Sequence, residues 1–248
     1  MTDFIVVIPA RYGSTRLPGK ALADIAGRPM IAWVHAQACR SQARKVIVAT
    51  DDDRIAAACR ECGARVEMTA ADHASGTDRI AELAERCGWH DGQIVVNVQG
   101  DEPLMPPKLV TQVAELLAGT PGAAIATLTT PVLSEDEFRD PNRVKVVADS
   151  DGFALYFSRA PIPHRAAGLP ASMTQRHVGI YAYRAGSLKA LSAAPPSPLE
   201  REERLEQLRA LHLGLRIAVA EAEDAPPRGV DTQEDLEAIR AIVASRSD

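Results

Sequence analysis

The residues most suited to chemistry lie in a loop near the start of the chain, residues 9–20, which carries three cations and two glycines. The loop follows the apolar run 4–8, which is typical of a buried strand in a parallel sheet. Ligands of open α/β sheets bind beyond the carboxyl ends of the strands. Glycine lets the backbone approach a ligand closely, and Arg11, Arg16 and Lys20 supply positive charge. The loop predicts a phosphate-binding site; the alternative interpretation is a basic surface turn.

The spacing of this loop excludes two better-known phosphate loops. A P-loop needs G-x-x-x-x-G-K-[ST], but five residues separate Gly13 from Gly19, and neither Ser nor Thr follows Lys20. The dinucleotide fingerprint G-x-G-x-x-G is also missing from the loop. Neither a Walker nucleotide site nor a dehydrogenase is predicted. The hydroxyls of Ser14 and Thr15 are expected to donate to phosphate oxygens instead.

Asp101 is the main candidate for a metal ligand. Asp101 comes directly after a glycine at the end of the predicted strand 93–98. A carboxylate there is well placed to hold Mg²⁺ against phosphates, because Mg²⁺ is usually bound by one or two carboxylates together with substrate phosphates. The alternative is an ordinary turn aspartate. Asp231 lies just before Thr232 and Asp235, the capping pair of the last predicted helix, so its carboxylate is free for another task.

Polar residues also follow the predicted strand 45–50. Asp52 and Asp53 are expected to cap the next helix, whose first turn favours negative charge. Thr50 and Asp51 lie at the carboxyl end of the strand, where they are in position to face a bound nucleotide base. They are two further candidates for a nucleotide site.

Arg79 stands in an unusual place for a cation. The segment 75–78 is typical of a helix start, with Thr77 expected as the N-cap of a helix over 78–87. Arg79 would lie in the first turn, where positive charge is unfavourable against the helix dipole. A local rule broken in this way predicts that Arg79 serves a ligand anion.

Strands and helices are expected to alternate along most of the chain. Buried strands are predicted at residues 4–8, 45–50, 64–68, 93–98, 123–129 and 215–220. Helices are predicted at residues 29–40, 54–62, 78–87 and 106–118, after Ser197 and after Thr232. This order predicts an α/β fold with a mixed, mostly parallel sheet flanked by helices.

From residue 131 onward, the alternation of strands and helices gives way to consecutive predicted strands. The runs 143–149 and 153–157 flank a Ser-Asp-Gly turn, and a further strand is expected at 177–183. The pattern predicts an antiparallel insert or rim. Five of its polar side chains are candidates for receiving an acidic substrate: Arg159, His164, Arg165, Arg176 and His177. The alternative is that each is a solvated loop residue.

The segment 197–200 has the spacing of a capping box, with serine as N-cap, proline at N1 and glutamate at N3. The helix that it opens is expected to bury Leu205, Leu208 and Leu211. Glu206 and Gln207 fall next to this apolar stripe. They are either surface residues or residues that reach into a pocket.

The composition is that of an ordinary globular protein, with 248 residues, 46% of them hydrophobic and 25% charged. A net charge of -5 argues against broad nucleic-acid binding, which needs many phosphate-neutralising cations. The apolar runs are too short for a transmembrane helix, and the N-terminus does not have the pattern of a signal peptide, so a cytoplasmic protein is expected. The irregularly spaced cysteines are expected to be reduced: Cys39, Cys59, Cys62 and Cys87.

Together, these segments closely resemble the 3-deoxy-D-manno-octulosonate (KDO) cytidylyltransferase family, whose members are also called CMP-KDO synthetases. The matching segments lie in the expected order at residues 8–20, 49–51, 72–77, 97–103, 154–159, 179–181, 197–200, 205–209 and 229–232. Several motifs in register are far more specific than any one of them.

The resemblance implies a nucleotide-diphospho-sugar transferase-like, Rossmann-like fold in a single domain over residues 1–248. An antiparallel insert at about 131–185 would contribute to a homodimer. The implied reaction is CTP plus KDO giving CMP-KDO and pyrophosphate, with Mg²⁺, for lipopolysaccharide biosynthesis. The stretch between residues 162 and 176 is shorter than the family pattern, which puts the sugar specificity and the dimer contact in question.

The resemblance also implies roles for individual residues. The nucleotide would be bound by Pro9, Ala10, Arg11, Ser14, Thr15, Arg16, Lys20, Thr50, Asp51, Gln99 and Gly100. The sugar would be bound by Arg79, Gln99, His177, Tyr183, Glu206 and Gln207. The metal carboxylates would be Asp101 and Asp231. Arg11, Lys20 and Asp101 would carry catalysis by neutralising charge, and no side-chain general base is predicted.

Three alternative functions are distinguished by the sequence features that each of them requires. A cytidylyltransferase for another acidic sugar, such as sialic acid or an amino-substituted KDO, is the nearest, although segment 99–103 favours KDO. A non-catalytic nucleotide-binding regulator would be expected to lose a metal carboxylate or Lys20, and the chain keeps them. A Rossmann-type oxidoreductase lacks its glycine fingerprint here.

Overall fold

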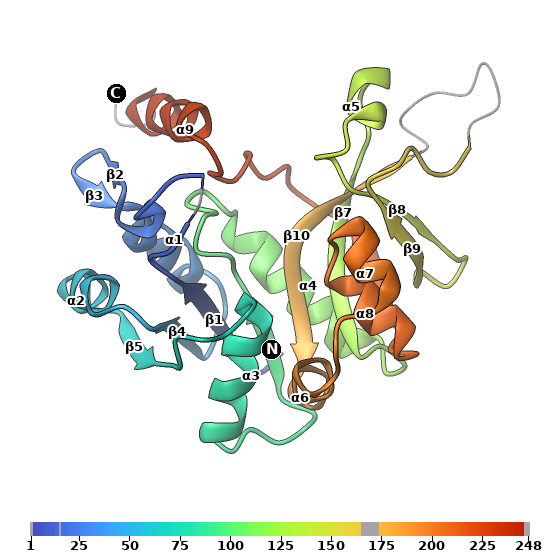
Figure 1. Cartoon of the computed structure of the whole chain (residues 1–248), viewed down its shortest axis with the longest axis horizontal. Coiled ribbons are helices and arrows are strands. Elements are labelled where there is room, and N and C mark those ends of the chain that lie inside the picture. The colour runs from blue at the N-terminus through green and yellow to red at the C-terminus, as the bar shows by residue number, and fades with distance from the viewer. Residues whose placement is uncertain (1, 15, 165–173, 246–248) are drawn as a thin grey trace.

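A nine-stranded sheet forms the centre of the computed structural model, which describes residues 2–14, 16–164 and 174–245 (Figure 1). The strands of the described residues are β1 (Phe4–Ala10), β2 (Asp24–Ile25), β3 (Arg28–Pro29), β4 (Lys45–Thr50), β5 (Arg65–Met68), β6 (Ile94–Asn97), β7 (Ile125–Pro131), β8 (Lys145–Ala148), β9 (Ala154–Ser158), β10 (Gln175–Arg184) and β11 (Ile217–Glu221). Of these, β2 and β3 form a separate two-stranded sheet. The helices are η1 (Lys20–Leu22, a 3₁₀ turn), α1 (Met30–Cys39), α2 (Asp53–Glu61), α3 (Gly76–Arg86), α4 (Pro107–Gly119), α5 (Glu135–Arg139), α6 (Ala185–Ala193), α7 (Pro198–Glu203), α8 (Gln207–His212) and α9 (Gln233–Ser245).

The first strand lies in the interior of the sheet. Seven strands of the sheet lie in the order β11-β7-β10-β6-β1-β4-β5, and β8 and β9 join it through β10. β1 therefore has parallel partners on both sides, β4 and β6. All seven residues of β1 are buried, as its apolar sequence predicts. The chain runs outward to β4 and β5 on one side and returns to β6 on the other. Such a reversal opens a crevice at the carboxyl ends of the strands, where ligands of α/β sheets bind.

The predicted antiparallel strands β8, β9 and β10 are present, but β10 lies inside the main sheet. β8 and β9 pair antiparallel at the rim, as expected. β10 instead lies between β6 and β7 and runs antiparallel to both, so it is not a rim strand. Ile180 and Ala182 pack into the core on one face of the sheet, and Tyr181 and Tyr183 into the core on the other. A strand with both faces covered is a central strand.

Helices cover both faces of the sheet. Phe4, Val6 and Ile8 of β1 belong to the core beneath α1, α2 and α4. The alternate residues Ile5 and Val7 belong to the core beneath α3, α6 and α8. The period of two along the strand divides β1 between these layers. The predicted α/β fold with a flanked, mostly parallel sheet is confirmed.

The last helix packs away from the sheet, on the β2–β3 hairpin (Figure 1). Ile25, Leu104, Val230 and Leu236 belong to a third apolar cluster that joins α9 to this hairpin. The N–H of Val230 also donates to the carbonyl of Asp101, at 2.8 Å. The docking of α9 therefore fixes the segment before it against the turn that follows β6.

Most predicted helix starts are confirmed, and one is wrong. Asp52 accepts a hydrogen bond from the N–H of Arg54, at 2.9 Å, and caps α2. Helix α3 begins two residues earlier than predicted, with Ser75 rather than Thr77 as the N-cap. Ser75 and Asp78 form a reciprocal capping box, which satisfies two backbone donors where Thr77 would satisfy fewer.

The helix expected after Ser197 is present but interrupted. The capping box is confirmed, and α7 then ends at Arg204, whose φ of 53° lies in the left-handed region. Of the three leucines expected in its core, Leu205 and Leu208 are buried and Leu211 is half-buried. The break leaves Glu206 at the start of α8, where its side chain turns toward α3.

In the described ranges, none of the helices has the length and apolarity needed to cross a membrane. The four cysteines are free thiols, of which Cys59 is buried and Cys39 and Cys87 are exposed.

Candidate active site

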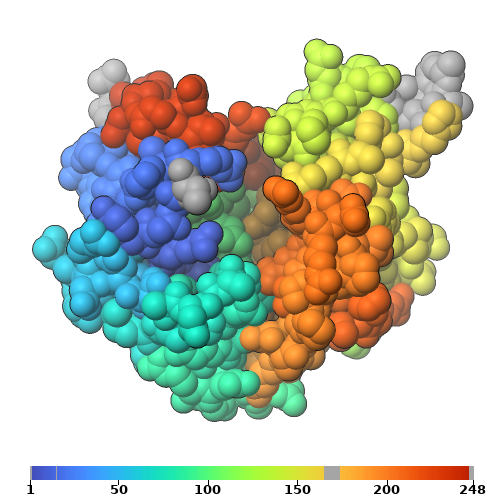
Figure 2. All heavy atoms as spheres, viewed as in Figure 1, coloured from blue at the N-terminus to red at the C-terminus, as the bar shows by residue number. Residues whose placement is uncertain are grey.

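A cavity of about 280 Å³ opens at the carboxyl ends of β1 and β6, in the hollow between the N-terminal and C-terminal halves (Figure 2). Many of the residues predicted to bind a nucleotide line it: Pro9, Ala10, Arg11, Ser14, Arg16, Lys20, Gln99 and Gly100. Thr15 lies outside the described residues. The predicted phosphate loop therefore forms one wall of a cavity at the expected edge of the sheet.

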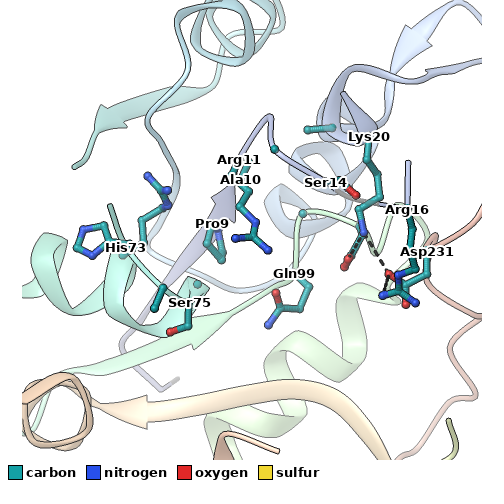
Figure 3. Close-up of a pocket in the computed structure, with 17 residues that line it drawn as sticks. Pro9, Ala10, Arg11, Ser14, Arg16, Lys20, His73, Ser75, Gln99 and Asp231 are labelled. Atoms are coloured by element: carbon teal, nitrogen blue, oxygen red, sulfur yellow. Dashed lines mark hydrogen bonds and ion pairs between the residues drawn. The ribbon is translucent and has the colours of Figure 1, made fainter. Parts of the chain in front are cut away.

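The two predicted metal carboxylates meet in this cavity, although they are far apart in the sequence. Lys20 Nζ lies 2.7 Å from Asp101 Oδ2 and 3.3 Å from Asp231 Oδ1 (Figure 3). Arg16 Nη2 lies 2.9 Å from the same oxygen of Asp231. One ammonium group thus touches both carboxylates. The phosphate loop and the two acids form one cluster.

This carboxylate pair suits Mg²⁺ bound together with a substrate. Because the ammonium of Lys20 contacts Asp101 and Asp231 at once, both carboxylates are within reach of a single cation. No group of three or more His, Cys, Asp or Glu side chains able to hold a metal occurs among residues 2–14, 16–164 and 174–245. Mg²⁺ usually takes one or two carboxylates and completes its ligands with water and phosphate. The site therefore fits a cation that arrives with a nucleotide.

A third acid, Glu102, lies behind the pair. Burial and the nearby carboxylates of Asp101 and Asp231 raise the pKa of Glu102 to about 8, against the opposing effect of Lys20. A Cβ atom at Gly229 would lie only 2.5 Å from Glu102 Oε1. A side chain at this position would therefore force the Glu102 carboxylate to shift.

The phosphate loop is anchored to the neighbouring helix α2. The guanidinium of Arg54 stacks on the ring of Tyr12, 3.3 Å from its centroid. Asp52 fixes that guanidinium through its carboxylate, with Arg54 Nη2 at 2.6 Å. Gly19, with a φ of 70°, then donates its N–H to the carbonyl of Tyr12, which turns the chain toward Lys20.

Gly100 is the point at which the turn after β6 touches the phosphate loop. A Cβ atom at Gly100 would lie 2.9 Å from the backbone oxygen of Pro9, closer than real Cβ contacts allow. The turn can approach the loop only because this side chain is missing. Gly100 therefore sets the width of the nucleotide site.

We expect Gly100→Ala to lower kcat/KM for CTP by at least about tenfold and to cost about 1 to 3 kcal/mol of stability, because the backbone at Pro9 must move. Steady-state kinetics and urea unfolding measure the two effects. Gly119→Ala is the control, since its Cβ would meet nothing within 4 Å. Wild-type kinetics for Gly100→Ala would refute the role of this close approach.

The residues expected to read the base do not face this cavity directly. Thr50 is fully buried, and its hydroxyl accepts a hydrogen bond from the N–H of Asp52 at 3.3 Å. Asp51 Oδ1 lies 3.4 Å from Arg79 Nη2. Neither Thr50 nor Asp51 is among the lining residues. Asp51 is instead placed to orient Arg79, which does line the cavity.

Arg79 is buried in the cavity wall, 3% exposed. Its Nη1 donates to the Thr69 hydroxyl and to the carbonyl of Ala70. These contacts and Asp51 explain how the helix start tolerates a cation. Ligand binding by Arg79 stays a prediction.

Two of the predicted sugar residues lie in a polar cluster next to the cavity. Glu206 accepts hydrogen bonds from Ser75 Oγ at 2.9 Å and from Thr77 Oγ1 at 2.8 Å. Burial raises the pKa of Glu206, although the hydroxyls of Thr77 and Ser75 favour the ionised form. Burial also raises the pKa of Tyr183, which stacks on Tyr181 with 5.7 Å between centroids. Gln207, the first residue of α8, is half-buried beside them.

His177 continues this aromatic row along β10. Its ring lies 5.1 Å from that of Tyr181 and 5.4 Å from that of Phe157, measured between centroids. Its Nε2 is 3.0 Å from the hydroxyl of Thr127. Burial, together with neighbouring Arg176, lowers the pKa of His177 to about 3. At neutral pH the ring is therefore a neutral hydrogen-bonding group.

The lowered pKa of His177 predicts a pH dependence of stability. Between an unfolded pKa of 6.5 and the folded value of about 3, the unfolded chain binds the proton and the folded chain does not. Stability should fall by up to about 1.4 kcal/mol per pH unit as the pH drops below about 6.5. His177→Asn should remove that component, measured by urea unfolding between pH 4.5 and 7. The exposed His212→Asn is the control; equal slopes in all three proteins would contradict the prediction.

Two other candidates of the insert, Arg159 and Arg176, have partners within the protein. Arg159 donates through Nε to the carbonyl of Glu203, at 2.7 Å, and through Nη1 to that of Pro141, at 2.9 Å. Arg176 pairs with Glu137 at 3.2 Å. His164 is exposed, and Arg165 and most of the stretch between residues 162 and 176 lie outside the described residues.

The comparisons with known proteins agree with this geometry. A family described as "Cytidylyltransferase" matches residues 5–217. The 3-deoxy-manno-octulosonate cytidylyltransferase of Vibrio vulnificus (strain YJ016) is 54% identical, with 99% of this chain and 100% of the relative covered. That of Yersinia enterocolitica is 53% identical, with 98% and 100% covered.

The chain belongs to the 3-deoxy-manno-octulosonate cytidylyltransferase family.

A solved structure extends this finding to the fold. The structure of CMP:2-keto-3-deoxy-manno-octonic acid synthetase complexed with CTP is 42% identical, with a TM-score of 0.92 over 99% of this chain and 100% of that chain. The resemblance inferred from the sequence motifs is confirmed. As a family member, the chain is a nucleotidyltransferase.

The structure adds cavity residues that sequence reasoning did not assign to the cytidylyltransferase site. His73 and Ser75 line the cavity, and His73 Nε2 lies 2.5 Å from Glu82 Oε2. The Ser-x-x-Asp spacing of the α3 capping box would have drawn attention to Ser75. Asn97 does not line the cavity, but it is buried at the end of β6, and its Oδ1 lacks a hydrogen-bond partner among the described residues. No local signal marks Asn97, because its apolar neighbours make it look like a strand residue.

Proposed function

We propose that this chain transfers CMP from CTP to the anomeric hydroxyl of 3-deoxy-D-manno-octulosonate (KDO), with release of pyrophosphate, for lipopolysaccharide biosynthesis. Full-length relatives at 54% identity support this substrate pair through their names, and the solved relative with a TM-score of 0.92 contains CTP. The proposal includes Mg²⁺ as cofactor.

The strongest support for the proposal is the contact of Lys20 with both Asp101 and Asp231. A cation of the phosphate loop lies within 3.3 Å of two carboxylates that come from separate loops. In a nucleotidyltransferase the triphosphate must be neutralised on one side and held on the other. A single cluster with both charges at the mouth of the nucleotide cavity supplies both.

The reaction needs positioning and charge neutralisation more than covalent chemistry. The sugar hydroxyl forms a bond to the α-phosphorus while the bond to the bridging oxygen breaks, in line. Arg11, Arg16 and Lys20 neutralise the triphosphate, and a bidentate guanidinium also fixes its orientation. Asp101 and Asp231 would hold Mg²⁺, which would supply positive charge beside the phosphates and would lower the pKa of a bound hydroxyl. A dedicated side-chain base is then unnecessary.

The sugar is proposed to bind between the cavity and β10. Gln99 reaches it from the nucleotide side, and His177, Tyr183 and Glu206 form the opposite wall. The neutral ring of His177 and the raised pKa of Glu206 suit hydrogen bonds to sugar hydroxyls rather than to the carboxylate. Arg79 is the cation proposed to face the sugar acid.

We also propose that the enzyme is one domain that acts as a homodimer in the cytoplasm. The continuous sheet from β11 to β5 supports a single domain. Leu133 and Leu155 are exposed at the edge that carries β8, β9 and α5, which supports an association surface there. Light scattering that shows only a monomer at working concentration would contradict the dimer.

Pyrophosphate release tests the proposed function directly. Each of the four nucleoside triphosphates is paired with a panel of sugar acids, including KDO, amino-substituted KDO and sialic acid, with and without Mg²⁺. Release with CTP and KDO alone, and only with Mg²⁺, is expected. Equal release with sialic acid would change the substrate, and no release with any pair would refute the activity.

A further inference from the structure

A buried threonine of β7 contacts the ring of His177, one of the residues proposed to bind the sugar. Thr127 is fully buried, and β7 runs beside β10 in the sheet (Figure 1). The hydroxyl oxygen of Thr127 lies 3.0 Å from His177 Nε2. Within residues 2–14, 16–164 and 174–245, no other hydrogen bond to this ring is present. The polar environment of the ring inside the protein is therefore set by Thr127.

The pairing of β10 with β7 is irregular at this point. Val178 pairs with Leu128, and the next pair along the strands is Tyr181 with Thr127. Gly179 and Ile180 lie between these pairs and take part in the pairing with neither β7 nor β6. A bulge of this kind changes the direction of nearby side chains and leaves backbone groups without partners in the ladder. Buried carbonyls of the bulge need another donor.

The hydroxyl of Thr127 is that donor. Its oxygen lies 2.7 Å from the carbonyl oxygen of Ile180 and 3.2 Å from that of Val178. A hydroxyl has one proton and two lone pairs, whereas a carbonyl oxygen can only accept. Two oxygens at 2.7 Å have the usual separation of an O–H···O hydrogen bond, which requires a proton between them. The proton of Thr127 is therefore donated to Ile180.

This assignment determines which nitrogen of His177 carries a proton. Because the Thr127 proton is used by Ile180, the Thr127 oxygen can only accept from His177, so Nε2 is the protonated nitrogen. The lowered pKa of His177 keeps the ring neutral, so it carries a single N–H. In a neutral imidazole the other nitrogen is an acceptor. Nδ1 is then a lone-pair acceptor.

The packing around His177 keeps the ring in this orientation beside the active site. Phe157 packs edge-on against it, with an interplanar angle of 87°, and Tyr181 packs against it at 44°. His177 also lines a cavity of about 430 Å³, and Asp101 and Asp231 line both this cavity and the nucleotide cavity. The ring is therefore accessible to a ligand that lies next to the proposed metal carboxylates.

We propose that Thr127 is a positioning residue, which holds His177 in the tautomer whose Nδ1 accepts a hydrogen bond from a hydroxyl group of the sugar. The inference rests on the proposed function, which places the sugar against His177. A nitrogen that can only accept selects a donor, so it binds a hydroxyl and repels a carboxylate. Thr127 therefore contributes to specificity without touching the substrate, because it determines that the hydroxyl-bearing part of the sugar faces β10.

A purely structural role of Thr127 is the competing explanation. In that case the hydroxyl would only satisfy the carbonyls of the bulge, and His177 would be free to carry its proton on either nitrogen. Removing the hydroxyl would then lower the stability of the protein but would not change sugar recognition selectively. The tautomer of His177 and the selectivity of the kinetic effect separate the two explanations.

Nuclear magnetic resonance of the full-length protein tests the tautomer. The chain contains six histidines, which are labelled with ¹⁵N, and the signals of His177 are identified by their loss in His177→Asn. Long-range ¹H–¹⁵N correlations to the carbon-bound ring protons distinguish the two nitrogens. At neutral pH, wild type should have its proton on Nε2. A proton on Nδ1 would overturn the inference.

Steady-state kinetics test the positioning role. Thr127→Val keeps the size of the side chain but removes the hydroxyl, and it should raise KM for KDO by at least about fivefold. KM for CTP and kcat should stay within about threefold of wild type. Thr127→Ser, which restores a hydroxyl, should recover most of the loss. In Thr127→Val, the tautomer preference of His177 should also weaken in the same NMR experiment.

Thr129→Val is the matched control. Thr129 is a buried threonine of the same strand, and it is the residue of β7 that pairs with His177. Its hydroxyl donates to the carbonyl of Ala220, at 3.3 Å, and not to the ring. The substitution therefore causes a similar loss in the same region, but both KM values and the tautomer of His177 should be those of wild type.

Equal KM values for KDO in Thr127→Val and Thr129→Val would overturn the inference. Equal rises of KM for CTP and for KDO in Thr127→Val would also overturn it, because they would indicate a structural role. If Thr127→Val fails to fold by thermal unfolding, the tautomer in wild type decides, since that measurement needs no change at Thr127. A wild type that is inactive with every sugar acid would refute the proposed function instead, whatever its tautomer, so the two failures are distinguishable.

Discussion

Asp101→Asn should lower kcat with CTP and KDO by at least about a thousandfold, equivalent to about 4 kcal/mol of transition-state stabilisation. The amide keeps the size of the side chain but removes the negative charge that faces Lys20 and that is proposed to bind Mg²⁺. Because Asp101 is partly exposed and the substitution removes a single ion pair, with Lys20, the free energy of unfolding should change by no more than about 1 kcal/mol. Pyrophosphate release and urea unfolding measure the two quantities.

Asp224→Asn is the control for the change in net charge. Asp224 is exposed in the linker between β11 and α9, and it does not line the cavity of the candidate active site. Its kcat should be that of wild type. An Asp101→Asn enzyme that keeps near-full, Mg²⁺-dependent turnover would exclude Asp101 from the catalytic cluster.

Lys20→Ala should lower kcat/KM for CTP by about a hundredfold or more, chiefly because the triphosphate loses a charge-assisted contact. The Lys20 side chain is only 17% exposed, and its ammonium group contacts Asp101 and Asp231. Its loss therefore also leaves the two carboxylates without a cation between them. Higher Mg²⁺ concentrations should therefore recover part of the activity. Initial rates over a grid of CTP and Mg²⁺ concentrations measure both effects.

Lys108→Ala is the control for Lys20→Ala, since Lys108 is an exposed lysine on α4 that pairs with Glu223 at 2.7 Å. It should be indistinguishable from wild type. If kcat/KM of Lys20→Ala for CTP stays within about threefold of wild type, Lys20 does not contribute to binding of the triphosphate by the phosphate loop.

The sequence predicts elements well where one residue pattern decides them. The apolar run of β1, the Asp52 cap and the Ser197 capping box each depend on local chemistry, and the structure confirms them. The expectation for Thr77 was wrong because two hydroxyl residues competed for the cap. Ser75 is the N-cap, because Asp78 completes the capping box with it. The hydroxyl of Thr77 instead donates a hydrogen bond to Glu206.

Features that depend on distant parts of the chain could not be predicted in this way. The break after α7 occurs where Glu203 is held by Arg159, whose N–H donates to Glu203 Oε2 at 2.8 Å. The place of β10 between β6 and β7 is set by cores on both faces. Neither depends on the local sequence.

The candidate site divides in the same way. The position of polar residues and glycines after apolar strands predicted the phosphate loop and the metal role of Asp101. The resemblance to the family supplied the metal role of Asp231 and the sugar-binding residues. The contact of Lys20 with both carboxylates and the pairing of Arg79 with Asp51 appear only in the structure. Their partners are dozens of residues apart, and no spacing rule connects them.

Metal binding tests the central claim, that Asp101 and Asp231 together hold the cation beside the phosphate loop. Mn²⁺ binding is followed by electron paramagnetic resonance in the presence of CTP, in wild type, Asp101→Asn, Asp231→Asn and Asp224→Asn. The account predicts that each of the first two variants weakens Mn²⁺ binding by at least about tenfold, while Asp224→Asn binds like wild type. Wild-type Mn²⁺ affinity in both Asp101→Asn and Asp231→Asn would contradict it.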